Sequence, residues 1–373
     1  MERMSHYRPT KALINLNAIK SNVANLRTFI QPTVQIIAVV KANGYGHGDV
    51  EVAKAALEAG ATILAVATPE EAIHMREHFP NVDILVLGAS PVSFAPFAAA
   101  NRILLTVFTA QWIEEAQKLL TAEEVVKIHI KVDSGMGRIG VTDEQQLQQL
   151  LVAVEQTAHI KVDGIFTHFA TADEEDTTYF DNQITKFKAL LAMLPNKPRL
   201  VHVANTATAL IKEPSLQYDA VRYGISMYGL APSPYVETKL PFALQPAMSI
   251  ETELVHVKKL NKGESVGYGA TFTAEDDCYI GTLPIGYADG MIRQLAGERV
   301  IIGQQYARII GRICMDQCMI YLEKPFEIGE KVTLIGEQGD KKVTIDDWAH
   351  RMGTINYEVP CILSTRVPRV YIK

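Results

Sequence analysis

Eight short apolar runs, separated by stretches long enough for a helix, fill most of the chain between residues 35 and 225. They lie at residues 35–40, 62–66, 83–87, 102–107, 126–132, 162–166, 200–203 and 220–222. Runs that are apolar throughout, rather than at alternate positions, are typical of parallel strands buried on both faces of a sheet. The segments between them, such as 49–59 and 110–120, have the amphipathic pattern of helices. The pattern therefore predicts a series of βα units around a parallel sheet.

Such a series fits either a closed barrel or an open doubly wound sheet, because both have the same local pattern. The positions of the polar residues favour the barrel. In a barrel the functional groups gather at one mouth, where the strands end. Here Lys41 follows the first run, His168 follows the sixth, and Arg222 ends the eighth. We therefore predict an α/β protein in which residues 1–240 form a (β/α)8 TIM-type barrel.

The residues after Pro241 have a different character. Strand-like runs, among them 250–260 and 331–335, alternate there with glycine-containing turns and show little helical periodicity. A mostly β C-terminal domain over residues 241–373 is therefore expected. The four prolines between residues 232 and 246 suit a linker, because proline fixes the backbone and removes a hydrogen-bond donor.

The charge of the chain points to a small-molecule ligand. The net charge is −6 and no basic block is present, which argues against nucleic acid and anionic membranes as partners. No apolar run reaches the length of about 18 residues that marks a membrane span. The polar start MERMSHYRPT lacks the apolar stretch of a secretory signal, so a cytoplasmic location is expected.

The cysteines predict neither disulfides nor a metal site. Cys278, Cys314, Cys318 and Cys361 all lie in the last hundred residues, and a chain with so large a potential core folds without disulfides. Cys314 and Cys318 have no histidine or further cysteine at the spacing of a zinc site. We expect all four to stay reduced and no metal to be bound.

A lysine that emerges from an apolar strand into a glycine-rich loop is the densest chemical signal. Lys41 is followed by Gly44, Tyr45, Gly46 and Gly48. At a partly buried strand end the pKa of a lysine falls, and its free amine then attacks aldehydes to form an imine. The glycines let the backbone approach a planar ligand, and Tyr45 suits a hydrogen bond to a phosphate. Taken alone, the same loop also fits a flexible turn with a solvated lysine.

The ends of the seventh and eighth runs suit a phosphorylated cofactor, because barrels frequently bind phosphate there. Asn205 and Thr206 follow the seventh run, Arg222 ends the eighth, and Gly224 and Ile225 come after it. Thr206 supplies a hydroxyl, and Gly224 and Ile225 supply backbone N–H groups. Arg222 would face the ring nitrogen of pyridoxal phosphate and disfavour its protonation, which favours simple proton exchange. Taken singly, Arg222 also fits a surface ion pair and Thr206 a helix N-cap.

Nine motifs, in the same order along the chain, resemble those of the bacterial alanine racemases. They are AVVKANGYGHG (38–48), KVDSGMGRIG (131–140), FTHFATAD (166–173), HVANTAT (202–208), VRYGISMYGLAPS (221–233), GYGATFTA (267–274), LPIGYADG (283–290), GRICMDQCMI (311–320) and TINYEVPC (354–361). The resemblance covers nearly the whole chain. It implies an isomerase that interconverts L-alanine and D-alanine, uses pyridoxal 5'-phosphate and supplies D-alanine for peptidoglycan. It also implies a head-to-tail homodimer whose two active sites draw on both chains.

The same resemblance assigns two bases to the reaction. Lys41 corresponds to the Schiff-base lysine, which acts on the D-enantiomer, and Tyr268 corresponds to the opposing base, which acts on the L-enantiomer. Racemisation removes the Cα proton from one face of a planar external aldimine and returns a proton to the other face, so a base on each face suffices. The resemblance further implies that His168 and nearby arginines favour the phenolate form of Tyr268. Taken alone, Tyr268 also fits a packed aromatic residue of the β domain.

Further site residues follow from the resemblance. Arg138 is expected to reach the substrate carboxylate or the phenolic oxygen of the cofactor. Lys131 matches a lysine that is carbamylated in some members of the family. Met315 and Asp316 fall where the substrate carboxylate is bound from the second subunit. Tyr287 and Tyr357 are expected to line the entry to the site and the phosphate region.

Three other functions share parts of these patterns. A racemase for serine or for several amino acids would differ only in the width of the pocket, which one side chain can change. A decarboxylase of similar architecture would have an acidic residue where this chain has Arg222. A non-catalytic pyridoxal-phosphate-binding protein would resemble only the barrel and would lack the domain that carries Tyr268.

Overall fold

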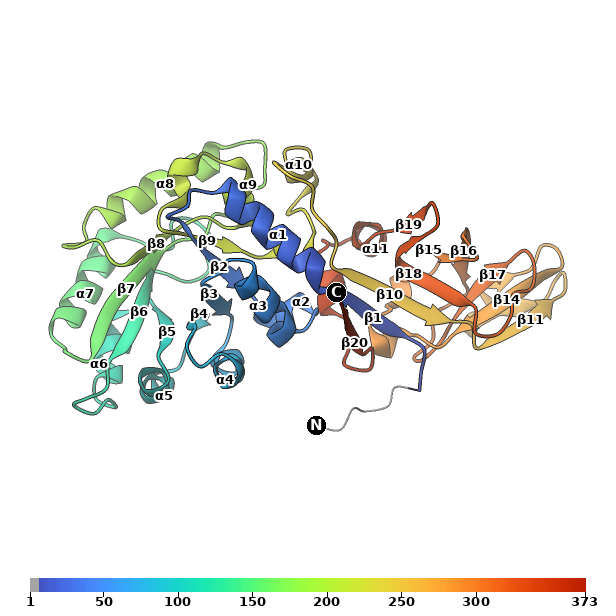
Figure 1. Ribbon diagram of the computed structural model, residues 1–373, viewed down its shortest axis with the longest axis horizontal. Helices are drawn as coiled ribbons and strands as arrows, with labels where there is room; N and C mark the ends of the chain where they lie inside the picture. The colour runs from blue at the N-terminus through green and yellow to red at the C-terminus, as the bar shows by residue number, and fades with distance from the viewer. Residues whose placement is uncertain (1–6) are drawn as a thin grey trace. The chain divides into compact units, whose positions relative to one another are not determined.

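The computed structural model describes residues 7–373, which divide into two units (Figure 1). The barrel unit consists of Ala18–Gly44 and Asp49–Gln245. The β unit consists of the described residues up to Asn17, Tyr45–Gly48 and Pro246–Lys373. In the described part of the chain, every helix is too short or too polar to cross a membrane.

The barrel unit is built on one sheet of eight parallel strands in the spatial order β8-β7-β6-β5-β4-β3-β2-β9. The strands are β2 (Gln35–Val39), β3 (Ile63–Val66), β4 (Asp83–Ala89), β5 (Ile103–Val107), β6 (Val126–Lys131), β7 (Ile160–Phe166), β8 (Leu200–His202) and β9 (Ala220–Tyr223). Each coincides with one of the predicted apolar runs. Most residues of these strands are buried, although β4 is fully buried only at Ile84, Leu85 and Val86.

Backbone hydrogen bonds bring the two ends of this sheet together. The N–H of Asp219 donates to the carbonyl of Val201 over 3.0 Å, and the N–H of Arg222 donates to the carbonyl of Ala204 over 3.0 Å. The Asp219 carboxylate also accepts the N–H of Val201 at 2.9 Å. In an open doubly wound sheet the outermost strands do not meet, so this seam between β8 and β9 excludes that alternative. The prediction of a (β/α)8 TIM-type barrel is confirmed.

Helices flank the barrel strands, as Figure 1 shows. They are α1 (Leu16–Phe29), α3 (Asp49–Glu58), α4 (Pro69–His78), α5 (Ala95–Ala100), α6 (Ala110–Ala116), α7 (Glu144–Glu155), α8 (Thr178–Leu191) and α9 (Thr206–Ile211). Shorter turns are α2 (Lys41–Tyr45), η1 (Val92–Phe94), η2 (Pro214–Gln217), η3 (Ile225–Tyr228) and α10 (Pro234–Glu237). The long helices are amphipathic: α7 buries Leu147, Leu150 and Leu151 on one face and begins at Asp143, whose side chain caps it.

The β unit is organised around a ten-stranded sheet in the order β11-β14-β17-β16-β15-β18-β10-β1-β20, with β19 paired to β18. Its strands are β1 (Lys11–Asn15), β10 (Met248–Glu253), β11 (His256–Leu260), β14 (Cys278–Leu283), β15 (Arg299–Ile302), β16 (Gln305–Ile310), β17 (Cys318–Leu322), β18 (Lys331–Gln338), β19 (Lys341–Val343) and β20 (Arg369–Ile372). The other elements are β12 (Ser265–Val266), β13 (Phe272–Thr273), η4 (Tyr268–Ala270), η5 (Tyr287–Asp289), η6 (Arg293–Leu295), α11 (Ile345–Met352) and α12 (Glu358–Cys361). The mostly β character expected of this region is confirmed.

The start of the chain differs from the predicted division, which placed residues 1–240 in the barrel domain. Strand β1 pairs antiparallel with β10 and parallel with β20, so it belongs to the sheet of the β unit. Its side chains alternate between buried and partly exposed, which is the pattern of a sheet with one buried face. Tyr45–Gly48 also joins the β unit, where Arg369 donates from Nε to the carbonyl of Gly46 over 2.8 Å.

We expect replacement of Asp219 to weaken the seam of the barrel. Asp219→Ala leaves the N–H of the buried Val201 without its side-chain acceptor, which typically destabilises a fold by about 1–3 kcal/mol. Asp219→Asn keeps an acceptor oxygen and should lose less. Urea unfolding followed by circular dichroism measures both, with the exposed Asp340→Ala as the control. Equal stability of Asp219→Ala and the control would show that the seam does not depend on this bond.

Candidate active site

The carboxyl ends of the barrel strands gather positive charge around one histidine. The pKa of His168 lies well below its usual value, first because the ring is buried, and then because of the charges of Arg222, Arg138, Lys131 and Lys41. Lys41 follows β2, Lys131 ends β6, His168 follows β7 and Arg222 lies in β9. We call these five residues the barrel-mouth cluster. Lysine and arginine side chains around a neutral imidazole favour an anionic ligand, which would also favour the charged form of Lys131.

The loop that Lys41 opens has a defined and unusual backbone. Ala42, Asn43 and Gly44 have φ of 53°, 52° and 59° with ψ near 50°, so α2 is a left-handed turn. Left-handed backbone costs about 1–2 kcal/mol for each residue other than glycine. A hydrogen bond of 2.7 Å from the N–H of Ala42 to the Glu71 carboxylate holds the turn. Strain of this kind is characteristic of functional sites, and the bond argues against a merely flexible loop.

Arg222 is buried and is held by neutral groups. Its guanidinium donates to the carbonyls of Thr167, His202 and Val203 over 2.8, 2.8 and 3.0 Å. It also donates to Nδ1 of His202 over 2.8 Å. Burial, and then the charge of Arg138, lowers the pKa of Arg222 to about 9, so the side chain stays protonated at neutral pH. The surface ion pair that Arg222 alone would also fit is therefore wrong.

A chain of buried side chains continues from Arg222 into the barrel. His202 Nε2 lies 2.9 Å from His129 Nδ1, and His129 Nε2 lies 3.3 Å from Asp163 Oδ2. The exposed Arg199 ends the chain at the surface, with bonds of 3.1 and 2.7 Å to the Asp163 carboxylate. Because arginine only donates, Nδ1 of His202 must accept, and its proton is on Nε2. This proton points to His129 Nδ1, so the proton of His129 is on Nε2 and points to Asp163.

The two histidines of this chain are neutral. Burial lowers the pKa of His129, and burial followed by the charge of Arg222 lowers the pKa of His202. Nothing in the sequence alone assigned a role to His129, Asp163 or Arg199. The available signal was the presence of polar residues inside apolar strands, because a buried polar group needs a partner.

The residues proposed for a phosphate lie together at the ends of β8 and β9. The hydroxyl of Thr206 accepts the N–H of Gly224 at 2.9 Å. Asn205 is the N-cap of α9, and its side chain accepts the N–H of Thr208 at 3.0 Å. Ile225 begins η3 directly after Gly224. The alternative that Thr206 is a helix N-cap is therefore wrong, because Asn205 occupies that position.

Lys131 and Arg138 belong to one loop structure after β6. Lys131 is buried, and its Nζ donates to the carbonyl of Val132 over 2.8 Å. Burial, and then the charge of Arg222, lowers the pKa of Lys131 to about 7, so much of it is the free amine at neutral pH. Asp133 accepts the N–H of Arg138 at 2.9 Å, which fixes the loop that carries this exposed arginine.

Two tyrosines of the β unit that were assigned to the cofactor lie near each other. The ring centroids of Tyr45 and Tyr357 are 6.2 Å apart. Burial raises the pKa of Tyr45 well above its usual value, so its hydroxyl remains a donor at neutral pH. Gly46 is required beside them, because a Cβ there would lie 2.0 Å from the carbonyl oxygen of Pro360.

Tyr287 and Met315 are brought together by a backbone contact. The N–H of Tyr287 donates to the carbonyl of Cys314, and the N–H of Ala288 donates to that of Met315, both over 3.0 Å. A Cβ at Gly286 would lie 2.4 Å from both acceptor oxygens, so glycine is needed there. The side chains of Tyr287 and Met315 are exposed. The neighbouring Asp316 forms an ion pair of 2.8 Å with Arg366.

Tyr268 lies in η4 with 70% of its surface exposed, so the alternative of a packed aromatic residue is wrong. Gly267 and Gly269, on either side, both have positive φ and hold the tyrosine on a tight turn. Arg312 lies against this turn, since a Cβ at Gly269 would be 3.0 Å from its guanidinium. Arg312 was not assigned a role from the sequence.

We expect the buried histidines to make the protein less stable in mild acid. His129, His168 and His202 stay neutral when folded, whereas the unfolded chain takes up protons below a pH of about 6.5. Their contribution is therefore present above that pH and is lost as the pH falls towards the lower folded pKa values. Each lowers the free energy of unfolding by about 1.4 kcal/mol per pH unit.

Urea unfolding between pH 5 and 6.5 measures this slope. His129→Gln should reduce it by about 1.4 kcal/mol per pH unit, the share of one histidine. The matched control is His256→Gln, because His256 is exposed on β11 and should leave the slope unchanged. A slope that His129→Gln does not alter would show that His129 is protonated in the folded protein.

Comparisons with known proteins agree over the full length of the chain. The N-terminal domain of alanine racemase matches residues 14–232, and the C-terminal domain of alanine racemase matches residues 247–371. The alanine racemase of Geobacillus stearothermophilus is 52% identical over 367 residues, which cover 98% of this chain and 94% of that protein.

Solved structures give the same result. That of alanine racemase from Bacillus anthracis with bound L-Ala-P has a TM-score of 0.96 at 44% identity, covering 99% of this chain and 96% of that one. Histidine racemase from Leuconostoc mesenteroides has a TM-score of 0.93 at 32% identity, covering 99% of each chain. The fold, the matched domains and the identity over nearly every residue show that the chain belongs to the alanine racemase family.

Proposed function

We propose that this protein interconverts L-alanine and D-alanine with pyridoxal 5'-phosphate as its cofactor. The observation that carries the proposal is the position of Arg222. This buried cation, held by carbonyls and an imidazole, lies on β9, which pairs with β2, and Lys41 follows β2 in the chain. Arg222 is paired in register with Ile37 of β2. The identity to alanine racemases supports the substrate.

The residues present fit this cofactor. Pyridoxal phosphate carries a phosphate and a phenolic oxygen, and the substrate adds a carboxylate, so the bound ligand is strongly anionic. The barrel-mouth cluster supplies the matching positive charge. Thr206, Gly224 and Ile225 of the barrel unit would hold the phosphate, with Asn205 fixing the start of α9. A role of Tyr45 and Tyr357 at the phosphate is what the resemblance to the family implies. When bound, the cofactor condenses with amino groups and withdraws electrons from the substrate Cα.

Lys41 and Tyr268 would move the proton. Lys41 Nζ holds the cofactor and exchanges a proton with one face of the substrate Cα, and the hydroxyl of Tyr268 exchanges one with the other face. Arg138 would bind the substrate carboxylate as a permanently charged donor. Nδ1 of His168 lies 3.3 Å from a terminal nitrogen of Arg222, which only donates, so the proton of the neutral ring is on Nε2. This N–H would donate a hydrogen bond to the Tyr268 oxygen, and such a bond favours the phenolate.

Arg222 would donate a hydrogen bond to the ring nitrogen of the cofactor and so keep that nitrogen unprotonated. The neutral chain of His202 and His129 supports this role, because it presents only an acceptor to Arg222. A less electron-withdrawing ring favours return of the proton over competing reactions.

The active form proposed is a homodimer with shared active sites. Tyr268, Tyr287 and Met315 are exposed on the β unit of the single chain, with 70%, 42% and 53% of their surfaces accessible. Large apolar side chains gathered on one surface typically mark an interface. In the dimer these three residues and Asp316 would complete the site of the other subunit. A cytoplasmic location and the supply of D-alanine to peptidoglycan remain predictions.

A racemase with a different or broader substrate is the second candidate. The histidine racemase from Leuconostoc mesenteroides has the same fold as this chain, so the scaffold alone does not fix the side chain of the substrate. The higher identity to alanine racemases favours alanine.

We expect the two bases to be separable by exchange of the Cα proton in D2O, followed by NMR. Lys41→Ala should abolish exchange from both enantiomers. Tyr268→Phe should slow exchange from L-alanine by about 10²–10⁴-fold, the usual contribution of a general base, and affect D-alanine less. Tyr306→Phe, an exposed tyrosine elsewhere on the β unit, is the control. Equal loss from both enantiomers in Tyr268→Phe would contradict the assignment of one base to each face.

Substrate choice is tested by the loss of optical rotation from L-alanine, L-serine and L-histidine, with and without added pyridoxal phosphate. We expect kcat/KM for alanine to exceed that for serine by at least about 10-fold, as one additional polar atom changes selectivity by about 1–3 kcal/mol. A preference for serine or histidine would replace alanine as the substrate while leaving the reaction type in place.

A further inference from the structure

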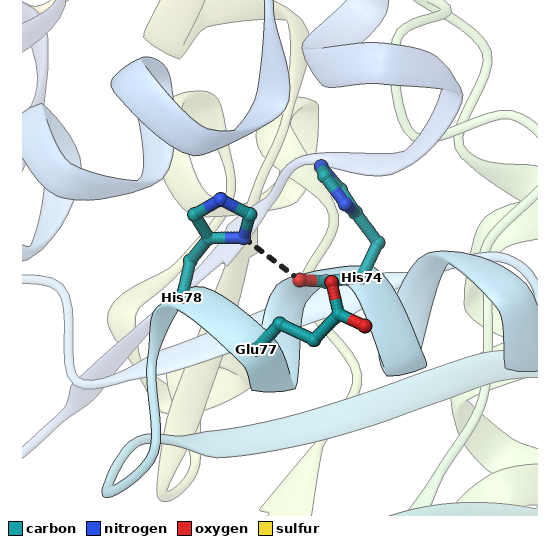
Figure 2. Close-up of side chains that lie close together, drawn as sticks. All are labelled: His74, Glu77 and His78. Carbon is teal, nitrogen blue, oxygen red and sulfur yellow. Dashed lines mark hydrogen bonds between the residues drawn. The ribbon is translucent and has the colours of Figure 1, made fainter. Parts of the chain in front are cut away.

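Three potential metal ligands lie on one face of α4, on the outside of the barrel unit. Figure 2 shows His74, Glu77 and His78 projecting from the helix. Their spacing of three and four residues puts them side by side. One ligand atom from each lies within 4.8 Å of the others, and all three side chains are exposed. The two imidazole centroids are 4.8 Å apart.

A hydrogen bond sets the proton of His78. Its Nδ1 lies 3.0 Å from the carbonyl oxygen of His74, the bond drawn in Figure 2. A carbonyl only accepts, so in the neutral ring the proton is on Nδ1 and the lone pair is on Nε2. A backbone carbonyl that binds the second ring nitrogen is the usual support of a histidine that ligates a metal. His78 is therefore prepared to bind a cation through Nε2.

A carboxylate on the neighbouring helix lies next to one of these three residues, outside the group of ligand atoms that lie within 4.8 Å of one another. The Oδ1 atom of Asp49, the first residue of α3, lies 3.5 Å from His74 Nε2. Two ligand atoms on one tetrahedral Zn²⁺, with bonds of about 2.0–2.1 Å, are about 3.3 Å apart. The 3.5 Å between Asp49 Oδ1 and His74 Nε2 is close to that value. Two imidazoles with two carboxylates suit Zn²⁺, whereas Mg²⁺ and Ca²⁺ prefer oxygen ligands alone.

The same helix braces both sides of the loop that Lys41 opens. On one side Glu71 of α4 accepts the N–H of Ala42. On the other side His74 contacts Asp49, where the chain returns to the barrel unit. The two sides are adjacent, since a Cβ at Gly44 would lie 3.1 Å from the Cα of Asp49. A cation shared by α4 and Asp49 would therefore restrain the left-handed turn.

We propose that His74, Glu77, His78 and Asp49 bind one Zn²⁺ ion, and that this ion clamps α4 to the start of α3 beside the Lys41 loop. The site is separate from the proposed racemisation chemistry. A bound ion replaces a contact between side chains by bonds to a common centre, so it should reduce local opening of the residues on either side of it.

Isothermal titration of ZnCl2 into the full-length protein loaded with pyridoxal phosphate, in a buffer without phosphate ions, tests the site. We expect one equivalent of Zn²⁺ to bind to the wild type. His78→Gln should weaken binding by at least about 10-fold, since even changes around the ligands of a metal site have effects of this size. The double variant His74→Gln/His78→Gln should lose the equivalent. His350→Gln is the matched control, because His350 is also exposed on a helix.

Zn²⁺ could instead bind to a thiol, and Cys361 is an exposed cysteine. The variant Cys361→Ser distinguishes such binding from binding at the α4 site. Loss of the equivalent in Cys361→Ser, or its retention in the double variant, would overturn the site, as would the absence of binding to the wild type. Circular dichroism confirms that the variants fold.

The clamp is tested by hydrogen exchange. Zn²⁺ should slow amide exchange of residues 42–44 by several-fold in the wild type and not in the double variant. Binding without this protection would overturn the clamp.

Discussion

The buried guanidinium of Arg222 is the most demanding group in the barrel, because an ion removed from water destabilises a fold unless every donor finds an acceptor. Three carbonyls and the Nδ1 atom of His202 accept from its two terminal nitrogens, which carry four of the five N–H donors of the guanidinium. An imidazole that accepts from an arginine must be neutral and must place its own proton elsewhere. Nδ1 of His129 accepts a hydrogen bond from that N–H, and the carboxylate of Asp163 accepts one from Nε2 of His129. The interior of the barrel is thus organised by one cation and the directions of its hydrogen bonds.

The charge of the barrel mouth is not balanced within this group of residues. Arg222, Arg138, Lys131 and Lys41 all lower the pKa of His168, because their charged forms repel a proton on its ring. The same repulsion, together with burial, keeps much of Lys131 uncharged at neutral pH. Asp133 offsets the positive charges only in part, because its carboxylate also accepts backbone N–H groups of its own loop. Mutual repulsion among cations reduces stability, and an anionic ligand relieves it. The site is therefore poised for a ligand that carries several negative charges.

A feature of the fold or the site could be predicted from the sequence when the interaction that determines it lies within a short stretch of the chain. Continuous apolar runs report burial on both faces, so the strands, the closed barrel and the polar residues at its mouth followed from the sequence. The place of strand β1 in the β unit did not follow from the sequence. Its alternating pattern is local, but its partners β10 and β20 are more than 200 residues away in the chain. The chain through His129 and Asp163 depends on strand register. The left-handed turn was unforeseen because Ala42 does not favour it, and the contacts that hold it, such as the bond to Glu71, come from outside the loop.

The seam between β8 and β9 has a consequence for how ligand binding and folding are coupled. Thr206 begins α9 after β8, whereas Gly224 follows β9, so the two lie on opposite sides of the place where the barrel has the fewest backbone bonds. An anion bound by both residues would connect the two sides of the seam. Its binding free energy would then add directly to the work needed to open the barrel. Loading with an anionic ligand and closure of the barrel would therefore be thermodynamically linked, so that each favours the other.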